Sequence, residues 1–257
     1  MFDRLIGYKD LFLVFIWREF VIRYRQSFIG VLWAVLQPVS MMLLFVLVFG
    51  VILKTTQKDY PYALFFYAGI LPWTFFAGST NFAVGSLSSN FNLITKIYFP
   101  REILPLSGVA INFADFMIAF VVYLGLMLYY GIGFTLNFFW MIPLFILLVI
   151  FTAAFGLLLA ALNVYYRDVK LASGFIVQFL FFATPVIYSI DAVDNKWKLL
   201  LFLNPLTFII ENMRRVTIEG RGIVLWQLAF ETVLISVFYM VVYKIFIRIE
   251  RAFADVI

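Results

Sequence analysis

The chain has 257 residues, of which 65% are hydrophobic and only 13% charged, and its formal net charge is +5. A soluble domain of this length needs far more charge to cover its surface, so this composition indicates an integral membrane protein. The absence of cysteine excludes disulfides and Cys-ligated metals, and the absence of histidine removes the commonest general base. The Lys and Arg are scattered among apolar segments, which favours a role in membrane topology over nucleic-acid binding.

The first 26 residues are expected to form an amphipathic helix that lies in the membrane interface. Its apolar face would carry Ile6, Leu13, Trp17, Phe20 and Tyr24, and its other side Arg4, Arg18 and Arg25. Arginines on such a helix can reach lipid phosphates while the apolar face meets acyl chains. The alternative is an unusually polar first span, which is disfavoured because its charged side chains would sit in or near hydrocarbon.

Six later stretches are long and apolar enough to cross the bilayer, which takes about 20 residues. They lie near 28–53, 61–87, 103–130, 138–162, 171–189 and 223–247. No extended sheet pattern interrupts them. The sequence therefore predicts a single all-α integral membrane domain over 1–257, with a six-span bundle at 28–247 and a cytoplasmic tail at 248–257.

The distribution of Lys and Arg favours an orientation with both termini in the cytoplasm. An exception is the broken apolar segment 197–222, which precedes the last span and carries several basic residues outside. Its run Leu199–Ile210 is too short to cross, and Asn204–Pro205 interrupts it, so two short helices that dip into the outer leaflet are expected. A seventh span kinked at Pro205 is rejected, because it would put the C-terminal basic residues outside.

Catalytic motifs are missing from the sequence. There is no G-x-x-x-x-G-K-[ST] phosphate-binding loop, no Ser/His/Asp set, no H-E-x-x-H and no clustered carboxylate pair. A transporter subunit or a channel is therefore favoured over an enzyme.

Four stretches together resemble the permease subunit of ABC type-2 exporters of lipid-linked polysaccharide. They are "RYRQSFIGVLWAVLQP" (23–38), "KIYFPREILPLS" (96–107), "YYRDV" (165–169) and "LNPLTFIIE" (203–211). The resemblance implies a homodimer in the bacterial inner membrane, with two cytoplasmic ATP-binding subunits docked beneath it. The cargo would be a polysaccharide on an undecaprenyl-diphosphate carrier, with O antigen favoured over teichoic acid or capsule. This chain would hold no cofactor, since ATP and Mg²⁺ would be bound by the partner ATPase.

Two alternatives remain open at this point. One is a type-2 permease for a small molecule or a lipid. The other, from a different class, is a membrane enzyme that acts on lipid-linked glycans, such as a polymerase or ligase. Such an enzyme would need catalytic residues in an outer loop, and long outer loops are mostly lacking here.

Two inner turns are expected to contact the ATPase. In 91–105, Phe99–Pro100 can end one helix and Pro105 can begin the next, so a short helix parallel to the membrane is plausible. The other turn lies between spans four and five. The residues assigned to this coupling are Lys96, Tyr98, Phe99, Arg101, Glu102, Arg167 and Asp168. The alternatives are a solvated loop and a tight turn whose basic residues only set topology.

The substrate's diphosphate is expected to meet Arg23, Tyr24 and Arg25, because arginine forms charge-assisted hydrogen bonds with phosphate. The alternative is a basic anchor that contacts bulk anionic lipid. Aromatic residues on the first two spans could stack on sugar rings and line a channel. The candidates are Trp33, Tyr62, Phe65, Phe66 and Trp73, although each could instead serve lipid contact or packing.

Two carboxylates fall inside predicted spans. Asp115, with Asn112 one turn earlier, is a functional candidate because intramembrane carboxylates are costly. It could equally be protonated or hydrogen-bonded within the bundle. Glu231 could pair with an arginine of the outer segment.

Overall fold

The computed structural model describes residues 7–25, 27–52 and 60–256, and within these ranges every regular element is helical. The N-terminal elements are α2 (Lys9–Tyr24), η1 (Gly30–Leu32), α3 (Trp33–Phe45) and the π-helical η2 (Val46–Ile52). The central elements are α4 (Tyr62–Ser89), α5 (Phe91–Ile94), α6 (Ile103–Tyr129), η3 (Leu136–Trp140) and α7 (Met141–Tyr165). The C-terminal elements are α8 (Asp168–Ala183), η4 (Ile190–Ala192), α9 (Asn195–Phe202), α10 (Pro205–Thr217) and α11 (Leu225–Val256).

Five helical segments are long and apolar enough to cross a membrane, namely Gly30–Ile52, Tyr62–Ser89, Ile103–Tyr129, Leu136–Tyr165 and Leu225–Glu250. The predicted fifth span corresponds to α8, which has 16 residues and ends at Ala183 instead of reaching 189. It ends there because Thr184 precedes Pro185 and takes an extended conformation. At 1.5 Å per residue, α8 is about 24 Å long, shorter than the hydrocarbon core of about 30 Å.

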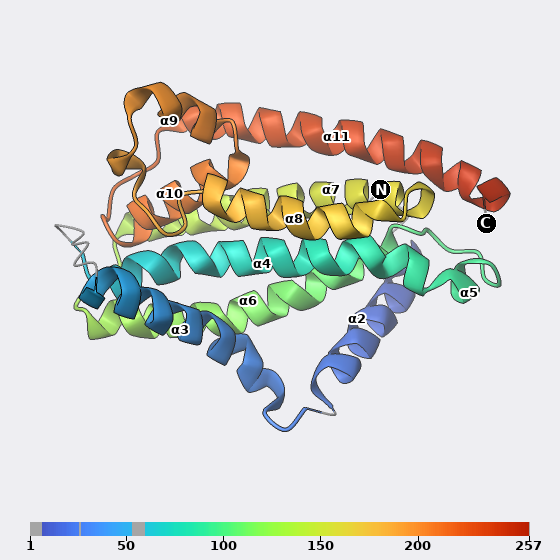
Figure 1. Cartoon of the computed structure of the whole chain (residues 1–257), viewed down its shortest axis with the longest axis horizontal. Helices are drawn as coiled ribbons and strands as arrows, with labels where there is room; N and C mark the ends of the chain where they lie inside the picture. The colour runs from blue at the N-terminus through green and yellow to red at the C-terminus, as the bar shows by residue number, and fades with distance from the viewer. Residues whose placement is uncertain (1–6, 26, 53–59, 257) are drawn as a thin grey trace.

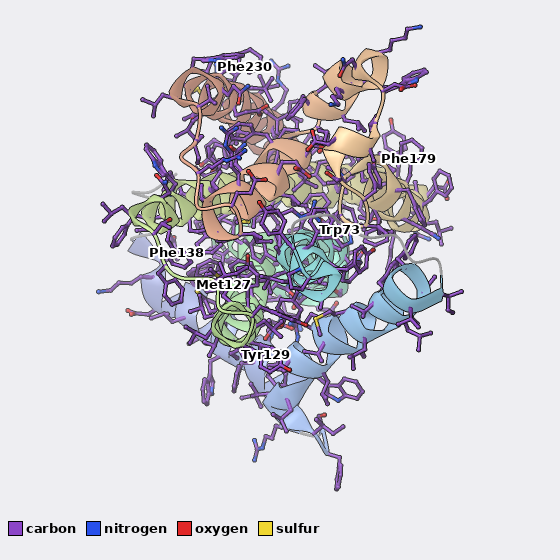
Figure 2. The ribbon with its side chains drawn as sticks, turned by 90° about the vertical axis from the view of Figure 1, so that its left-hand side faces the viewer. Trp73, Met127, Tyr129, Phe138, Phe179 and Phe230 are labelled. Carbon is purple, nitrogen blue, oxygen red and sulfur yellow. The ribbon has the colours of Figure 1, made fainter. Side chains whose placement is uncertain are left out.

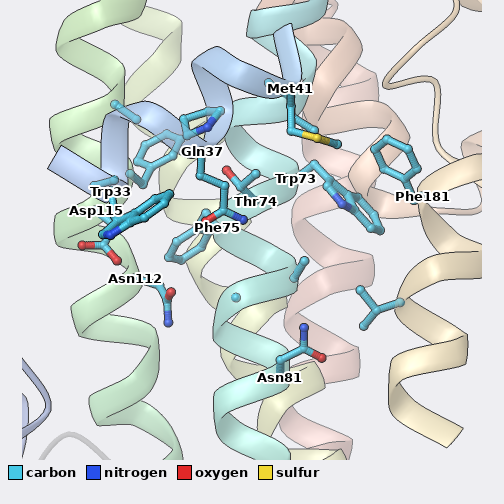
Figure 3. Close-up of a pocket in the computed structure, with 18 of the residues that line it drawn as sticks. Trp33, Gln37, Met41, Trp73, Thr74, Phe75, Asn81, Asn112, Asp115 and Phe181 are labelled. Carbon is cyan, nitrogen blue, oxygen red and sulfur yellow. The ribbon is translucent and has the colours of Figure 1, made fainter. Parts of the chain in front are cut away.

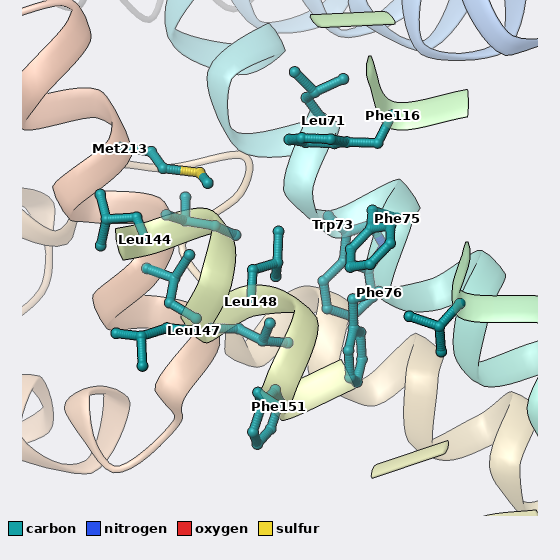
Figure 4. Close-up of a cluster of buried hydrophobic side chains, with 14 of the residues drawn as sticks. Leu71, Trp73, Phe75, Phe76, Phe116, Leu144, Leu147, Leu148, Phe151 and Met213 are labelled. Atoms are coloured by element: carbon teal, nitrogen blue, oxygen red, sulfur yellow. The ribbon is translucent and has the colours of Figure 1, made fainter. Parts of the chain in front are cut away.

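The helices form an elongated bundle around α4 (Figure 1). Most of α4 is buried, whereas Gly30–Ile52 is largely exposed. A helix that is apolar on every side is expected at the centre of a bundle, and α4 packs against both α6 and α7. Phe76 of α4 meets Phe151 of α7 in this core, with ring centroids 5.8 Å apart (Figure 4).

Small residues allow α4 to approach its neighbours. A Cβ added at Gly108 of α6 would lie 1.9 Å from the ring of Phe82, and one added at Gly156 of α7 would lie 2.9 Å from the Cβ of Ala83. Such contacts replace the hydrophobic effect as the source of helix association in lipid. On the outside, Tyr129, Phe179 and Phe230 are exposed, while Met127 is buried (Figure 2). Apolar side chains thus face both inward and outward, as expected for a protein surrounded by lipid.

The two ends of the bundle differ. Helix α5, the α7–α8 turn and the C-terminus lie at one end, here called the α5 end, and α9 and α10 lie at the other, the α10 end (Figure 1). The helical conformation is interrupted between α9 and α10 at Asn204, whose Oδ1 accepts a hydrogen bond from the Leu206 amide at 3.1 Å. Pro205 then occupies the first turn of α10, where its missing N–H costs nothing.

Helices α2 and α3 form the two arms of a V beside the bundle (Figure 1). Helix α2 runs obliquely from the α5 end and packs on α6. Leu13 and Trp17 are exposed, while Phe15 and Tyr24 are buried. The predicted apolar face is therefore divided, with Tyr24 turned toward the bundle; Arg4 and Ile6 lie outside the described residues.

Candidate functional site

A pocket with a volume of about 770 Å³ lies among α2, α3, α4, α6 and α8 (Figure 3). Its polar lining consists of Arg23, Tyr24, Gln37, Ser40, Thr74, Asn81, Asn112, Asp115 and Gln178. Its aromatic lining consists of Trp33, Trp73, Phe75, Phe116 and Phe181. These side chains come from segments that are far apart in the sequence, so only the fold brings them together.

An ion pair between Arg23 and Asp115 lies at one side of this pocket. Asp115 is near the midpoint of α6, and its other carboxylate oxygen accepts a hydrogen bond from the Tyr24 hydroxyl. The Arg23 Nη1 also donates to the Asn112 Oδ1 at 3.3 Å, while the Asn112 Nδ2 donates to the Gly108 carbonyl at 2.7 Å. The cluster therefore joins α2 to α6 at mid-length.

The Tyr24 hydroxyl stays protonated at neutral pH. Burial raises the pKa of Tyr24 to about 12, and the neighbouring Asp115 carboxylate contributes in the same direction. Tyr24 is therefore a permanent donor to Asp115. Of the three residues assigned to the diphosphate, Arg23 and Tyr24 line the pocket, whereas Arg25 is exposed at the end of α2 and is not part of the lining.

Three side-chain amides in the pocket were not singled out from the sequence. Gln37, Asn81 and Gln178 come from α3, α4 and α8, and none of them hydrogen-bonds another of the described side chains or backbones. All three are exposed. An amide left in hydrocarbon without a partner is costly, so this face requires water, substrate or protein against it. The sequence did contain a signal for them, because each is a side-chain amide within one of the predicted apolar spans.

The structure separates the five aromatic candidates into two groups. Trp33 and Trp73 line the pocket. Tyr62, Phe65 and Phe66 do not, and each has contacts elsewhere in the bundle. Phe66 is fully buried and stacks on Phe45 with ring centroids 4.5 Å apart. The Tyr62 hydroxyl donates to the Ile187 carbonyl at 3.0 Å. Within one chain, Tyr62 and Phe66 therefore make packing contacts and do not line the pocket.

Phe65 belongs to a second buried arginine site, near the α10 end. The guanidinium of Arg214 lies 3.7 Å from the centroid of the Phe65 ring and donates to the Phe65 carbonyl at 3.2 Å. It also donates to the carbonyls of Pro185 and Val186, each at 2.6 Å, and to the Glu211 Oε1 at 2.9 Å. Arg214 therefore ties α10 to α4 and to the chain that follows α8.

The predicted coupling helix in 91–105 is shorter than expected. Helix α5 has four residues, Phe91–Ile94, and an irregular segment leads to α6, which begins at Ile103 with Pro105 in its first turn. The Arg101 amide donates to the Glu250 Oε1 at 3.1 Å, and its Nη1 donates to the Glu250 carbonyl at 2.9 Å. These bonds hold the segment against α11.

The remaining residues assigned to coupling differ in exposure. Glu102 is buried and accepts a hydrogen bond from the Tyr243 hydroxyl at 3.4 Å. Phe99 is buried beside Phe15, with ring centroids 5.8 Å apart. The members of this set that are exposed lie at the α5 end and are Lys96, Tyr98, Arg167 and Asp168. These four are available to a partner, whereas Arg101, Glu102 and Phe99 contact the chain itself.

Glu231 of α11 is buried. No ion pair joins it to an arginine of segment 197–222 in the described part of the chain, and its Oε2 has no hydrogen-bond partner there. The predicted pairing is therefore wrong for these residues: Arg214 turns inward to Glu211, and Arg221 pairs with Glu219 at 3.5 Å. Over the same residues, no cluster of three or more His, Cys, Asp or Glu could hold a metal ion.

A family model and several curated relatives match most of the chain. The family model described as ABC-2 type transporter matches residues 10–218. The chain is 33% identical over 223 residues to the O-antigen export system permease protein RfbA of Myxococcus xanthus, covering 84% of each chain. It is 28% identical over 217 residues to a protein of that name from Klebsiella pneumoniae, covering 84% of this chain and 83% of the relative.

A more distant relative is the polysialic acid transport protein KpsM of Escherichia coli, which is 24% identical over 211 residues and 79% of each chain. The matched region of the family model includes α2, the helices that line the pocket and α10. Most of its length is matched, and its described residues form a helical bundle with five segments long and apolar enough to cross a membrane, so the chain belongs to the ABC-2 type transporter family.

Proposed function

We propose that this chain is the membrane subunit of an ATP-driven exporter that moves undecaprenyl-diphosphate-linked polysaccharide across the bacterial inner membrane, with O antigen as the polymer. The observation that carries the proposal is the similarity to O-antigen export permeases over 84% of the chain. The pocket supports it, because free amides can hydrogen-bond sugar hydroxyls while Trp33 and Trp73 offer rings for stacking.

The pocket would form half of a channel that a second copy of the chain completes. Helices α3 and α8, which contribute to the pocket lining, also carry apolar side chains that are exposed in the single chain, among them Leu36, Leu43, Leu171, Phe175 and Phe179. A second copy would cover these residues and would leave the amides facing a water-filled path. Such a path lets irregular or polar groups exist at membrane depth.

Two ATP-binding subunits would dock at the α5 end, where Lys96, Tyr98, Arg167 and Asp168 are exposed. This chain would contribute no cofactor, and ATP with its Mg²⁺ would be bound by those subunits. Their nucleotide chemistry would drive transport through contacts with the inner turns.

The α5 end would then be cytoplasmic, together with both termini, and α9 and α10 would enter the outer leaflet from the external side. Single cysteines at Asn195, Arg215 and Arg221 test this orientation, since the native chain has no cysteine. All three should react with a membrane-impermeant thiol reagent in intact spheroplasts. Reaction of Arg215→Cys and Arg221→Cys only after the membrane is opened would contradict it.

The function is tested by deleting the gene and complementing it from a plasmid. The deletion should remove polymer from the cell surface and leave lipid-linked polysaccharide inside, because synthesis precedes export. Surface labelling with lectin or antibody and extraction of lipid-linked glycans measure the two pools. Unchanged surface polymer in the deletion strain, at normal synthesis, would overturn the proposal, and a vector without the gene is the matched control.

A further inference from the structure

We propose that Asp115 is a built-in competitor for the anionic group of the substrate, so that Arg23 is released from Asp115 when a diphosphate enters the pocket. The inference rests on the proposed function, because it names the group of the lipid-linked substrate that this site recognises. It adds to that function an exchange of ion-pair partners: Arg23 is paired with Asp115 before the substrate binds and with the diphosphate afterwards.

The placement of the pair favours exchange. The side chains of Arg23 and Asp115 are 33% and 20% exposed and both line the pocket, so a ligand can reach them. Among the residues that the structure describes, they are also the only charged ones in the pocket lining. An incoming anion therefore finds one cation in the pocket, already neutralised by one carboxylate.

The guanidinium of Arg23 has unused donors. Its contacts with Asp115 and Asn112 are both made by Nη1, and within the described residues Nε and Nη2 donate to no partner. Arginine binds phosphate best through two parallel N–H donors. A phosphate can thus begin to bind through the free donors before the bond to Asp115 breaks.

The surroundings of Asp115 lower the free-energy cost of breaking its ion pair with Arg23. When Arg23 turns to the phosphate, Asp115 keeps the hydrogen bond from the Tyr24 hydroxyl. An uncompensated buried charge is strongly destabilising, whereas a carboxylate that keeps a donor and faces an open pocket is less so. The exchange is therefore reversible, and Asp115 limits how tightly the diphosphate is held, which favours its onward movement.

The test is a binding titration of the full-length chain in lipid nanodiscs with undecaprenyl diphosphate, followed by native mass spectrometry. Asp115→Asn removes the competitor and should tighten binding severalfold, while Arg23→Gln should weaken it about tenfold or more. Arg23→Lys keeps the charge but loses the paired N–H donors of the guanidinium, so it should weaken binding severalfold. Lys9→Gln removes an exposed cation from the same helix and is the control, expected to bind as the wild type does.

A purely structural ion pair predicts a different pattern. Weaker binding in Asp115→Asn, parallel to Arg23→Gln, would overturn the exchange, as would binding equal to the wild type. Should Asp115→Asn fail to assemble, unchanged binding in Arg23→Lys would overturn it instead. Undecaprenol, which lacks phosphate, separates the two proposals. A wild-type chain that binds undecaprenol as well as undecaprenyl diphosphate contradicts both proposals. A preference for the diphosphate leaves the proposed function standing, whatever the variants do.

Discussion

Arg23 and Arg214 are two ion-paired arginines in one helical bundle, and they are held in opposite ways. The side chain of Arg214 is 4% exposed and donates to three backbone carbonyls as well as to Glu211. The side chain of Arg23 is 33% exposed, and its contacts pass through one nitrogen to Asp115 and Asn112. The first arginine is enclosed by the fold, whereas the second faces a pocket.

The difference separates an arginine that holds the fold together from one that a ligand can reach. Backbone carbonyls are fixed in place by the fold. The hydrogen bonds of Arg214 therefore persist as long as α4, α10 and the chain at Pro185 stay packed together. A side-chain carboxylate beside an open pocket can be replaced by another anion. The degree of enclosure, and whether the acceptors are backbone or side-chain oxygens, therefore distinguishes a fixed arginine from one that is available to a ligand.

The largest effect is expected from Arg214→Gln. This change leaves Glu211 and several buried carbonyls without their donor, which costs about 3–5 kcal/mol for a broken buried pair. The variant should lose its thermal transition, or most of its monodisperse protein, when measured by fluorescence-detected size exclusion. Arg23→Gln should stay assembled in the same assay, because the Arg23 side chain is partly exposed and lines a pocket.

The exposed Arg221 provides the matched control, since its side chain is 73% exposed and its pair with Glu219 spans 3.5 Å. Surface pairs of this kind contribute about 0–1 kcal/mol, so Arg221→Gln should behave as the wild type does. If Arg214→Gln is as stable as Arg221→Gln, the contrast between the enclosed and the open arginine fails.

A smaller effect is expected from Gly69→Ala, which attacks the same site from α4. The added Cβ would lie 2.3 Å from the Arg214 Nη2 and 3.0 Å from the Val186 carbonyl oxygen, so the arginine must shift. Overpacking of this kind costs about 1–3 kcal/mol. The melting temperature of the purified chain should fall by several degrees.

Gly85 on the same helix is the control, because a Cβ built there meets nothing within 4 Å. Alanine is the better helix former by about 1 kcal/mol, so Gly85→Ala should be neutral or slightly stabilising. Equal melting temperatures for the two alanine variants would mean that Arg214 is less tightly held than its contacts indicate.

Local properties of the sequence determined much of the architecture. Long apolar stretches predicted the five described helical segments that are long and apolar enough to cross a membrane, because crossing hydrocarbon demands a length and a composition that are visible residue by residue. Pro105 marked the start of α6, and Asn204–Pro205 marked the break before α10, since proline restricts the backbone locally. The motifs also indicated the family that the comparisons show.

Only the tertiary structure decided which polar residues meet. Arg23 and Asp115 are 92 residues apart, and the sequence left open whether Asp115 had a partner in the bundle. It grouped Phe66 with Trp33, although the first is fully buried and the second lines the pocket. Hydropathy locates a helix in the membrane without setting its rotation or its neighbours. Those depend on how small residues, proline breaks and side-chain shapes fit across helices, and that fit is decided by the whole bundle at once.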